Sequence, residues 1–121
     1  MTLQGKTVWT LIAVVTAALA LSGFADETSG DYADAALKVV ADGYTAMKFD
    51  PFAVRPDGVW EYTSRAPDRA RCDLAFERVR AVRDAVGPEI EILVEIHGNL
   101  GTTTAIHWGK RIEELDPFFY E

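Results

Sequence analysis

The 121-residue sequence contains a single cysteine, Cys72, so no disulfide can form within the chain. No metal-ligand or nucleophile motif lies beside Cys72, and we expect it to be a buried or half-buried residue of a helix. Positive charge is also scarce, because 12 Lys and Arg stand against 19 Asp and Glu and give a net charge of −7. This balance argues against a nucleic-acid-binding surface.

Basic residues cluster in one part of the chain, and there they are interleaved with acidic ones. We expect these arginines to lie on the solvated side of a helix: Arg65, Arg69, Arg71, Arg78, Arg80 and Arg83. No G-x-G-x-x-G segment follows an apolar run, which argues against a dinucleotide site.

The N-terminal segment, residues 1–25, is apolar, and no charged residue occurs between Thr7 and Ala25. Three interpretations are open: a secretory signal peptide ending at the small residues before Asp26, a membrane anchor, or a buried strand over residues 18–24. The strand is favoured, with a cytoplasmic location; the alternative is export or anchoring through residues 7–25.

Residues 26–121 form the second part of the chain and show a regular alternation of elements. Apolar spacing predicts helices that end at Gly43, at Gly87-Pro88 and before Asp116-Pro117. Their expected ranges are 29–42, 71–86 and 102–115, and the strands between and after them are expected at 45–50, 90–96 and 118–121. Such alternation predicts an α/β fold with a parallel sheet, either open or part of an incomplete TIM-type (β/α) barrel. A closed barrel would need eight strands and about 250 residues.

The strand at 90–96 leads into the segment "LVEIHGN" and has two different faces. Because side chains alternate along a strand, Ile92, Val94 and Ile96 share one face, while Glu95 and His97 lie on the other. The same rule places Lys48 and Asp50 on the face of their strand opposite Met47 and Phe49. It places Glu121 on the face of its strand opposite Phe118 and Tyr120.

These ionisable groups all lie at the carboxyl ends of parallel strands, where α/β folds build their active sites. Glu95 and Glu121 are one βα unit apart, so neighbouring strands would bring their carboxylates together. A divalent cation relieves the repulsion between them, and hard oxygen ligands favour Mg²⁺. Lys48 is then a candidate base or charge stabiliser with a pKa lowered by the metal and by burial, and His97 a candidate proton donor. Asp50, before Pro51, is either a catalytic or positioning residue or a turn residue.

Four stretches together resemble the mandelate racemase/muconate lactonizing branch of the enolase superfamily, and within it the galactonate dehydratase-like acid-sugar dehydratases. They are "GYTAMKFDPF" (43–52), "ERVRAVRDAVGP" (77–88), "VEIHGN" (94–99) and "LDPFFYE" (115–121). The resemblance implies Glu95 and Glu121 as the first two Mg²⁺ ligands. It also implies abstraction of the proton α to a sugar-acid carboxylate, then loss of a β-hydroxyl assisted by His97. The product would be a 2-keto-3-deoxy sugar acid.

Three features of this family are missing from the sequence. The third ligand, a later histidine base and the capping domain are not among the 121 residues. We therefore expect the isolated chain to turn over no sugar acid and to self-associate, whereas complete members are expected to be homo-oligomers. Two alternatives remain open: a non-catalytic barrel fragment, and a racemase or epimerase of the same superfamily.

Overall fold

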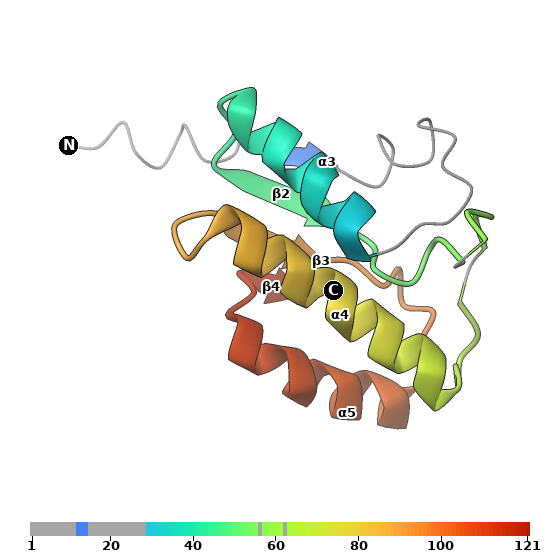
Figure 1. Cartoon of the computed structure of the whole chain (residues 1–121). Helices are drawn as coiled ribbons and strands as arrows, with labels where there is room; N and C mark the ends of the chain where they lie inside the picture. The colour runs from blue at the N-terminus through green and yellow to red at the C-terminus, as the bar shows by residue number, and fades with distance from the viewer. Residues whose placement is uncertain (1–11, 15–28, 56, 62) are drawn as a thin grey trace.

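The computed structural model describes residues 12–14, 29–55, 57–61 and 63–121 (Figure 1). Within these ranges one parallel sheet has the strand order β1-β2-β3-β4. Its strands are β1 (Ile12–Val14), β2 (Ala46–Phe49), β3 (Glu91–Val94) and β4 (Phe119–Tyr120). The helices that precede β2, β3 and β4 are α3 (Ser29–Ala41), α4 (Arg69–Val86) and α5 (Thr102–Ile112), and α5 continues into the 3₁₀ helix η1 (Glu113–Leu115). The prediction of parallel βα repeats is confirmed.

The structure describes little of the apolar N-terminal segment. The strand predicted at 18–24 lies outside the described residues, as does the possible cleavage site before Asp26. A strand does occur inside this segment, because β1 pairs in parallel with β2 through Ile12–Val14. In the part of the chain that the structure describes, no helix combines the length and apolar character needed to cross a membrane.

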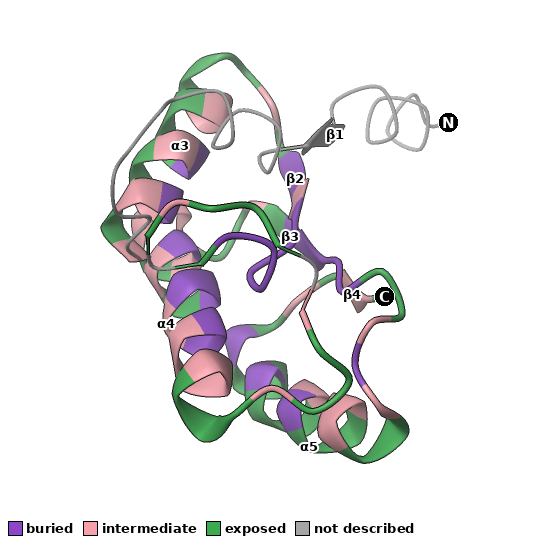
Figure 2. Cartoon of the chain, turned by 90° about the vertical axis from the view of Figure 1, so that its right-hand side faces the viewer, coloured by how far each residue is buried: buried purple, intermediate pink, exposed green. Residues whose placement is uncertain are grey.

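The helices cover one face of the sheet, and the core lies between the two layers (Figures 1 and 2). Alternate strand residues point into it, as the period of two requires. The buried apolar side chains of this core include Met47, Phe49, Ile92 and Val94 from the sheet, Tyr32 and Ala36 from α3, Val79 and Val82 from α4, and Trp108 and Ile112 from α5. The opposite face carries Lys48, Glu95 and Glu121.

Helix α4 shows both the success and the failure of the helix predictions. Its N-cap is Asp68, whose side chain accepts from the Arg71 N–H at 2.8 Å, and it ends at Gly87 with φ of 79°. The expectation that its arginines are all solvated is wrong, because Arg78 is fully buried. Arg78 lies three residues after Ala75 and four before Val82, so helical periodicity places it within the apolar stripe.

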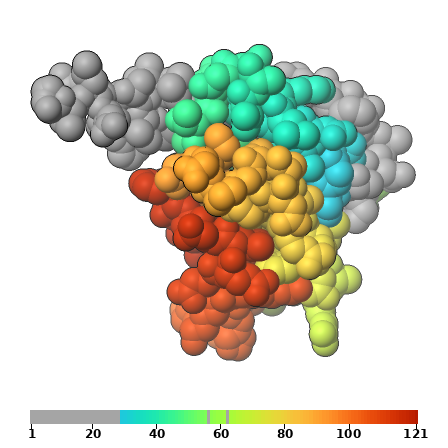
Figure 3. Space-filling model, turned by 60° about the vertical axis from the view of Figure 1, so that its left-hand side comes forward, coloured from blue at the N-terminus to red at the C-terminus, as the bar shows by residue number. Residues whose placement is uncertain are grey.

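Arg83 joins the turns at the amino ends of the strands. Its guanidinium donates to the carbonyls of Gly87 and Ile90, which precede β3, and to those of Leu115 and Asp116, which precede β4. These four bonds measure 2.7–2.9 Å. Figure 3 shows the end of α4 and its following turn, in orange, packed against the red residues before β4. One side chain thus connects two βα repeats.

Candidate active site

The register of the sheet brings Lys48, Glu95 and Glu121 together at its carboxyl edge. Lys48 pairs with Leu93, two residues before Glu95, so both side chains lie on the same face. The ladder continues past β3 and β4, since the Ile96 N–H donates to Glu121 O at 2.6 Å and the Glu121 N–H donates to Val94 O at 2.8 Å. Glu95 and Glu121 are therefore neighbours across the two strand ends, as the alternation of side chains predicts.

The ammonium of Lys48 forms ion pairs with both carboxylates. It contacts Glu95 Oε2, and its Nζ lies 2.8 Å from Glu121 Oε2. Hydrogen bonds to Glu121 and Glu95 raise the pKa of Lys48, and they outweigh burial, which lowers it as expected. Burial alone would raise the pKa of Glu95, but hydrogen bonds from Lys48 and from the His97 N–H lower it on balance. In this arrangement the lysine serves as the cation that the paired carboxylates require.

Asp50 and His97 form a second pair at the same edge. His97 Nε2 lies 3.5 Å from Asp50 Oδ2, and its Nδ1 lies 3.6 Å from Glu95 Oε1. His97 has a left-handed backbone with φ of 53°, and its N–H donates to Glu95 Oε1 at 2.7 Å. Asp50 is buried, and desolvation raises its pKa despite the hydrogen bond from the Phe52 N–H at 2.7 Å. The turn after Ile96 thus points the imidazole back over the strand ends.

Asp50 is followed by a segment whose carbonyls are held by side chains of α3 and α4. The Tyr32 hydroxyl donates to Asp50 O at 3.2 Å, and Arg71 donates to Phe52 O at 2.5 Å. Arg78 donates to Pro51 O at 2.9 Å and to Val54 O at 2.6 Å. The guanidinium of Arg78 also stacks on the Tyr32 ring at 4.7 Å.

We call Tyr32, Arg71 and Arg78 the carbonyl clasp. It fixes the backbone that carries Asp50, and the sequence analysis missed it as a feature of the site. The available signal was the position of Arg78 in the apolar stripe of α4, since a buried guanidinium requires several acceptors.

The donor set agrees in part with a Mg²⁺ site. Glu95 and Glu121 supply hard carboxylate oxygens, and their shared contact with Lys48 Nζ shows that both can reach one cationic centre. Among the described residues, no three His, Cys, Asp or Glu side chains are grouped so that they could hold a metal ion. These residues therefore fit as two ligands of a site that needs at least one more.

Cys72 lies in a helix and is partly buried, as predicted. Glu91, His107, Glu113 and Glu114 are exposed. Lys48, Asp50, Glu95, His97 and Glu121 converge instead on one edge. The structure thus separates the candidate site from the other charged residues of the repeats.

The molecule is an α/β domain made of part of a (β/α) barrel, with acid–base groups at the carboxyl ends of its strands. Residues 31–121 match the family described as "Enolase C-terminal domain-like". The chain belongs to this family, which confirms both the resemblance and the fold class.

Curated relatives show the same relationship over the same part of the chain. D-gluconate dehydratase of Thermoproteus tenax is 42% identical over 90 residues, covering 74% of this chain and 16% of the relative. D-gluconate/D-galactonate dehydratase of Picrophilus torridus is 33% identical over 91 residues, covering 75% and 21%. A crystal structure of a member of the enolase superfamily from Salmonella Typhimurium has a TM-score of 0.76 and 35% identity, covering 90% of this chain and 29% of that one. The chain thus spans about a fifth of the length of these curated relatives.

Proposed function

We propose that this chain supplies the barrel strands carrying the first two metal ligands and the lysine of a Mg²⁺-dependent acid-sugar dehydratase. The observation that carries the proposal is the convergence of Lys48, Glu95 and Glu121 at one sheet edge, with His97 beside them. The similarity to D-gluconate and D-gluconate/D-galactonate dehydratases supports a six-carbon aldonic acid as the substrate class.

Each residue has a role that its position supports. Glu95 and Glu121 would hold Mg²⁺, which when bound supplies positive charge against the substrate carboxylate and the negative charge developing next to it. Lys48 stabilises that charge as the ammonium that its raised pKa favours, or accepts the α-proton once that ammonium has lost its own proton. His97 donates a proton to the β-hydroxyl as its C–O bond breaks, so that water leaves and the remaining enol becomes the 2-keto-3-deoxy acid. Asp50 orients His97 through the 3.5 Å contact.

The role of these residues is testable in a chimera. Residues 31–121 would replace the matched segment of the Thermoproteus tenax dehydratase, and formation of 2-keto-3-deoxygluconate from gluconate would be followed with Mg²⁺ present. We expect an active chimera in which Lys48→Ala or Glu95→Gln lowers kcat by about 10²–10⁴-fold, the range for a lost acid–base or electrostatic group. Glu91→Gln, on the same strand but exposed, is the matched control and should leave kcat unchanged.

Three outcomes would count against the proposal. A folded but inactive chimera would favour a non-catalytic barrel fragment. Exchange of the α-proton with solvent deuterium without loss of water would indicate a racemase or epimerase. Turnover of gluconate by the 121-residue chain alone would contradict the expectation that two ligands are insufficient.

A further inference from the structure

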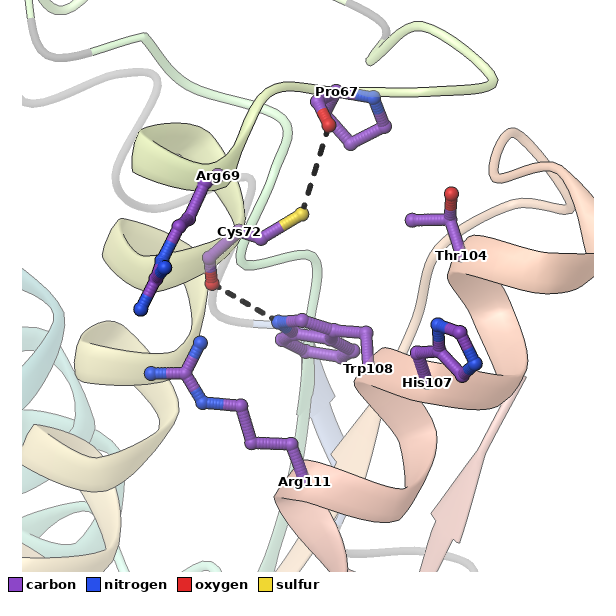
Figure 4. A pocket seen from close by; sticks show the side chains of 7 residues that line it. All are labelled: Pro67, Arg69, Cys72, Thr104, His107, Trp108 and Arg111. Atoms are coloured by element: carbon purple, nitrogen blue, oxygen red, sulfur yellow. Dashed lines mark hydrogen bonds between the residues drawn. The ribbon is translucent and has the colours of Figure 1, made fainter.

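A cleft of about 300 Å³ lies in the helical layer, between the N-terminal half of α4 and α5 (Figure 4). Arg69 and Cys72 of α4 line it on one side, and Thr104, His107, Trp108 and Arg111 of α5 line it on the other. None of these residues belongs to the candidate active site. Its volume is at the lower end of the range for small-molecule sites.

The side chains that line the cleft are mainly hydrogen-bond donors. Arg69 and Arg111 carry guanidinium groups, Thr104 a hydroxyl and His107 an imidazole, and among the described residues that line the cleft none is a carboxylate. Thr104, His107 and Arg111 lie on one face of α5, because they are three and four residues apart. The cleft therefore offers donors from two helices to one ligand.

Both guanidinium groups of the cleft share one acidic partner. Asp73 is the acidic partner of both guanidinium groups, with Arg111 Nη1 at 2.5 Å from Oδ1 and Arg69 Nε at 3.7 Å from Oδ2. One carboxylate can neutralise only one of the two positive charges. The neighbouring Asp68 carboxylate is engaged at the helix N-cap, where it accepts from the Arg71 N–H. Of the two guanidinium groups, Arg69 has the longer contact with Asp73 and is therefore the more available to a ligand.

The inner wall of the cleft is fixed by packing. Trp108 is buried, its indole N–H donates to Cys72 O at 3.1 Å, and its ring packs edge-on against Phe52 at 4.9 Å. The guanidinium of Arg111 stacks on the Phe76 ring at 4.2 Å. Because these contacts exist without a ligand, binding would require little ordering of the site.

We propose that this cleft binds a small oxyanion, either a phosphate or a carboxylate. The guanidinium groups match the planar, charge-assisted geometry that both anions favour, and Thr104 and His107 complete the set of donors. The site lies on the outer helical layer and is independent of the function proposed for the strand ends.

Cys72 allows anion binding in the cleft to be measured, because it is the only cysteine of the chain and it lies on the wall of the cleft. The rate of its alkylation by iodoacetamide in the 121-residue protein would be measured with increasing inorganic phosphate, with D-gluconate, and with chloride at the same ionic strength. The indole N–H of Trp108 would be followed in parallel by NMR. We expect phosphate, gluconate or both to slow alkylation and shift the Trp108 signal, and chloride to do neither.

Substitution of Arg69 distinguishes anion binding in the cleft from general screening of charge by dissolved ions. Arg69→Gln should raise the half-saturating concentration of the protecting anion by roughly two- to fivefold, because it removes one largely exposed charge contact. Arg80→Gln, on α4 but outside the cleft and paired with Glu77, is the matched control and should leave it unchanged. Protection by phosphate alone identifies a phosphate site, and protection by gluconate a carboxylate site. Equal protection by chloride, no protection by either anion, or an unchanged response in Arg69→Gln would overturn the proposal.

Discussion

Lys48 is the residue that joins the two carboxylates at the carboxyl edge of the sheet. Its ammonium is the counter-ion of Glu95 and Glu121, so one of their two negative charges is balanced within the chain itself. Any added cation must compete with this side chain for the same oxygens. We therefore expect Lys48 and Mg²⁺ to compete for the carboxylate oxygens of Glu95 and Glu121 in the 121-residue chain.

Replacing Lys48 by Met tests this competition. Without the ammonium, the two carboxylates repel each other and gain more from a divalent cation. We expect Lys48→Met to bind Mg²⁺ about two- to fivefold more tightly than the unaltered chain, as measured by isothermal titration calorimetry. Lys38→Met, an exposed lysine of α3, should have no effect. An unchanged or weaker affinity in Lys48→Met would show that the lysine does not compete.

Cys72 supplies a pH dependence whose sign follows from burial. Desolvation is the largest influence on its thiol and raises its pKa above the ordinary value of 9.0. The folded chain thus holds this proton more tightly than the unfolded chain does. Stability is fully retained below pH 9.0, and the free energy of unfolding falls as the pH rises through the folded pKa.

The rate of Cys72 alkylation against pH measures this shift directly. We expect the midpoint of the native protein to lie above 9.0, and that of the urea-unfolded protein to lie near it. A native midpoint at or below 9.0 would contradict the assignment of Cys72 to a desolvated position.

At the residue scale, the sequence predicted contacts that follow from periodicity and missed those that need three dimensions. Lys48, Glu95 and Glu121 were placed together because alternation and parallel strands determine both the face and the edge. The carbonyl clasp was not predicted, since the acceptors of Arg78 lie more than twenty residues away in a loop. Composition alone assigns an arginine to the surface, and this rule was wrong at Arg78.

Among the elements, α5 packs tightly against Tyr120 of β4 at Gly109. A Cβ at this position would lie 2.8 Å from Cε1 of Tyr120. The Tyr120 ring packs on Trp108 with ring centroids 5.7 Å apart, and the Tyr120 hydroxyl donates to Ala105 O at 3.1 Å. Tyr120 directly precedes Glu121. The glycine therefore lets α5 approach β4 while the neighbouring strand end keeps its position.

Gly109→Ala should destabilise the chain although alanine favours helices by up to about 1 kcal/mol. The clash with an aromatic ring is an overpacking effect that costs about 1–3 kcal/mol, so we expect a net loss of roughly 1 kcal/mol. Urea unfolding measures the change, with the exposed Lys110→Ala as a near-neutral control. A more stable Gly109→Ala would show that the ring moves without cost.

The carbonyl clasp connects α3 and α4 to the end of β2, and Arg78 is its central member. Arg78→Met keeps much of the side-chain volume but leaves the buried carbonyls of Pro51 and Val54 without this donor. We expect the free energy of unfolding to fall by roughly 2–3 kcal/mol. Arg80→Met, exposed on the same helix, should change it by less than about 0.5 kcal/mol. Equal effects of the two substitutions would exclude a special role for Arg78.

Element types were predictable along most of the chain, and their boundaries less so. Helix α4 begins at Arg69 rather than at 71, because Asp68 provides the N-cap. The helix predicted over 102–115 tightens into η1 at Glu113, and the chain then turns through Asp116 in the left-handed region with φ of 51°. Hydrophobic spacing marks a helix but does not reveal where its hydrogen-bond pattern changes.

At the scale of the molecule, the outer strands of the sheet that the structure describes lead to a prediction about behaviour in solution. Among the described residues, β1 and β4 each pair with one neighbouring strand, and Phe118 beside β4 is 54% exposed. Unpaired strand edges next to apolar side chains favour association between chains. We therefore predict that the 121-residue chain self-associates.

Phe118→Lys should weaken this association, because it places a charge beside the β4 edge. Sedimentation velocity over a concentration series would show a smaller mean mass for Phe118→Lys than for the unaltered chain. Leu37→Lys, at an apolar residue of α3 with 46% exposure, is the matched control and should not alter the mass. A monomer at all concentrations would contradict the prediction.

Arg83 has a consequence for how such a domain can change over evolution. Because one guanidinium secures the turns before β3 and β4, these two repeats are also joined at the end of the sheet opposite Lys48, Glu95 and Glu121. We expect substitutions in the loops at the carboxyl ends of the strands to leave this anchorage between the repeats intact.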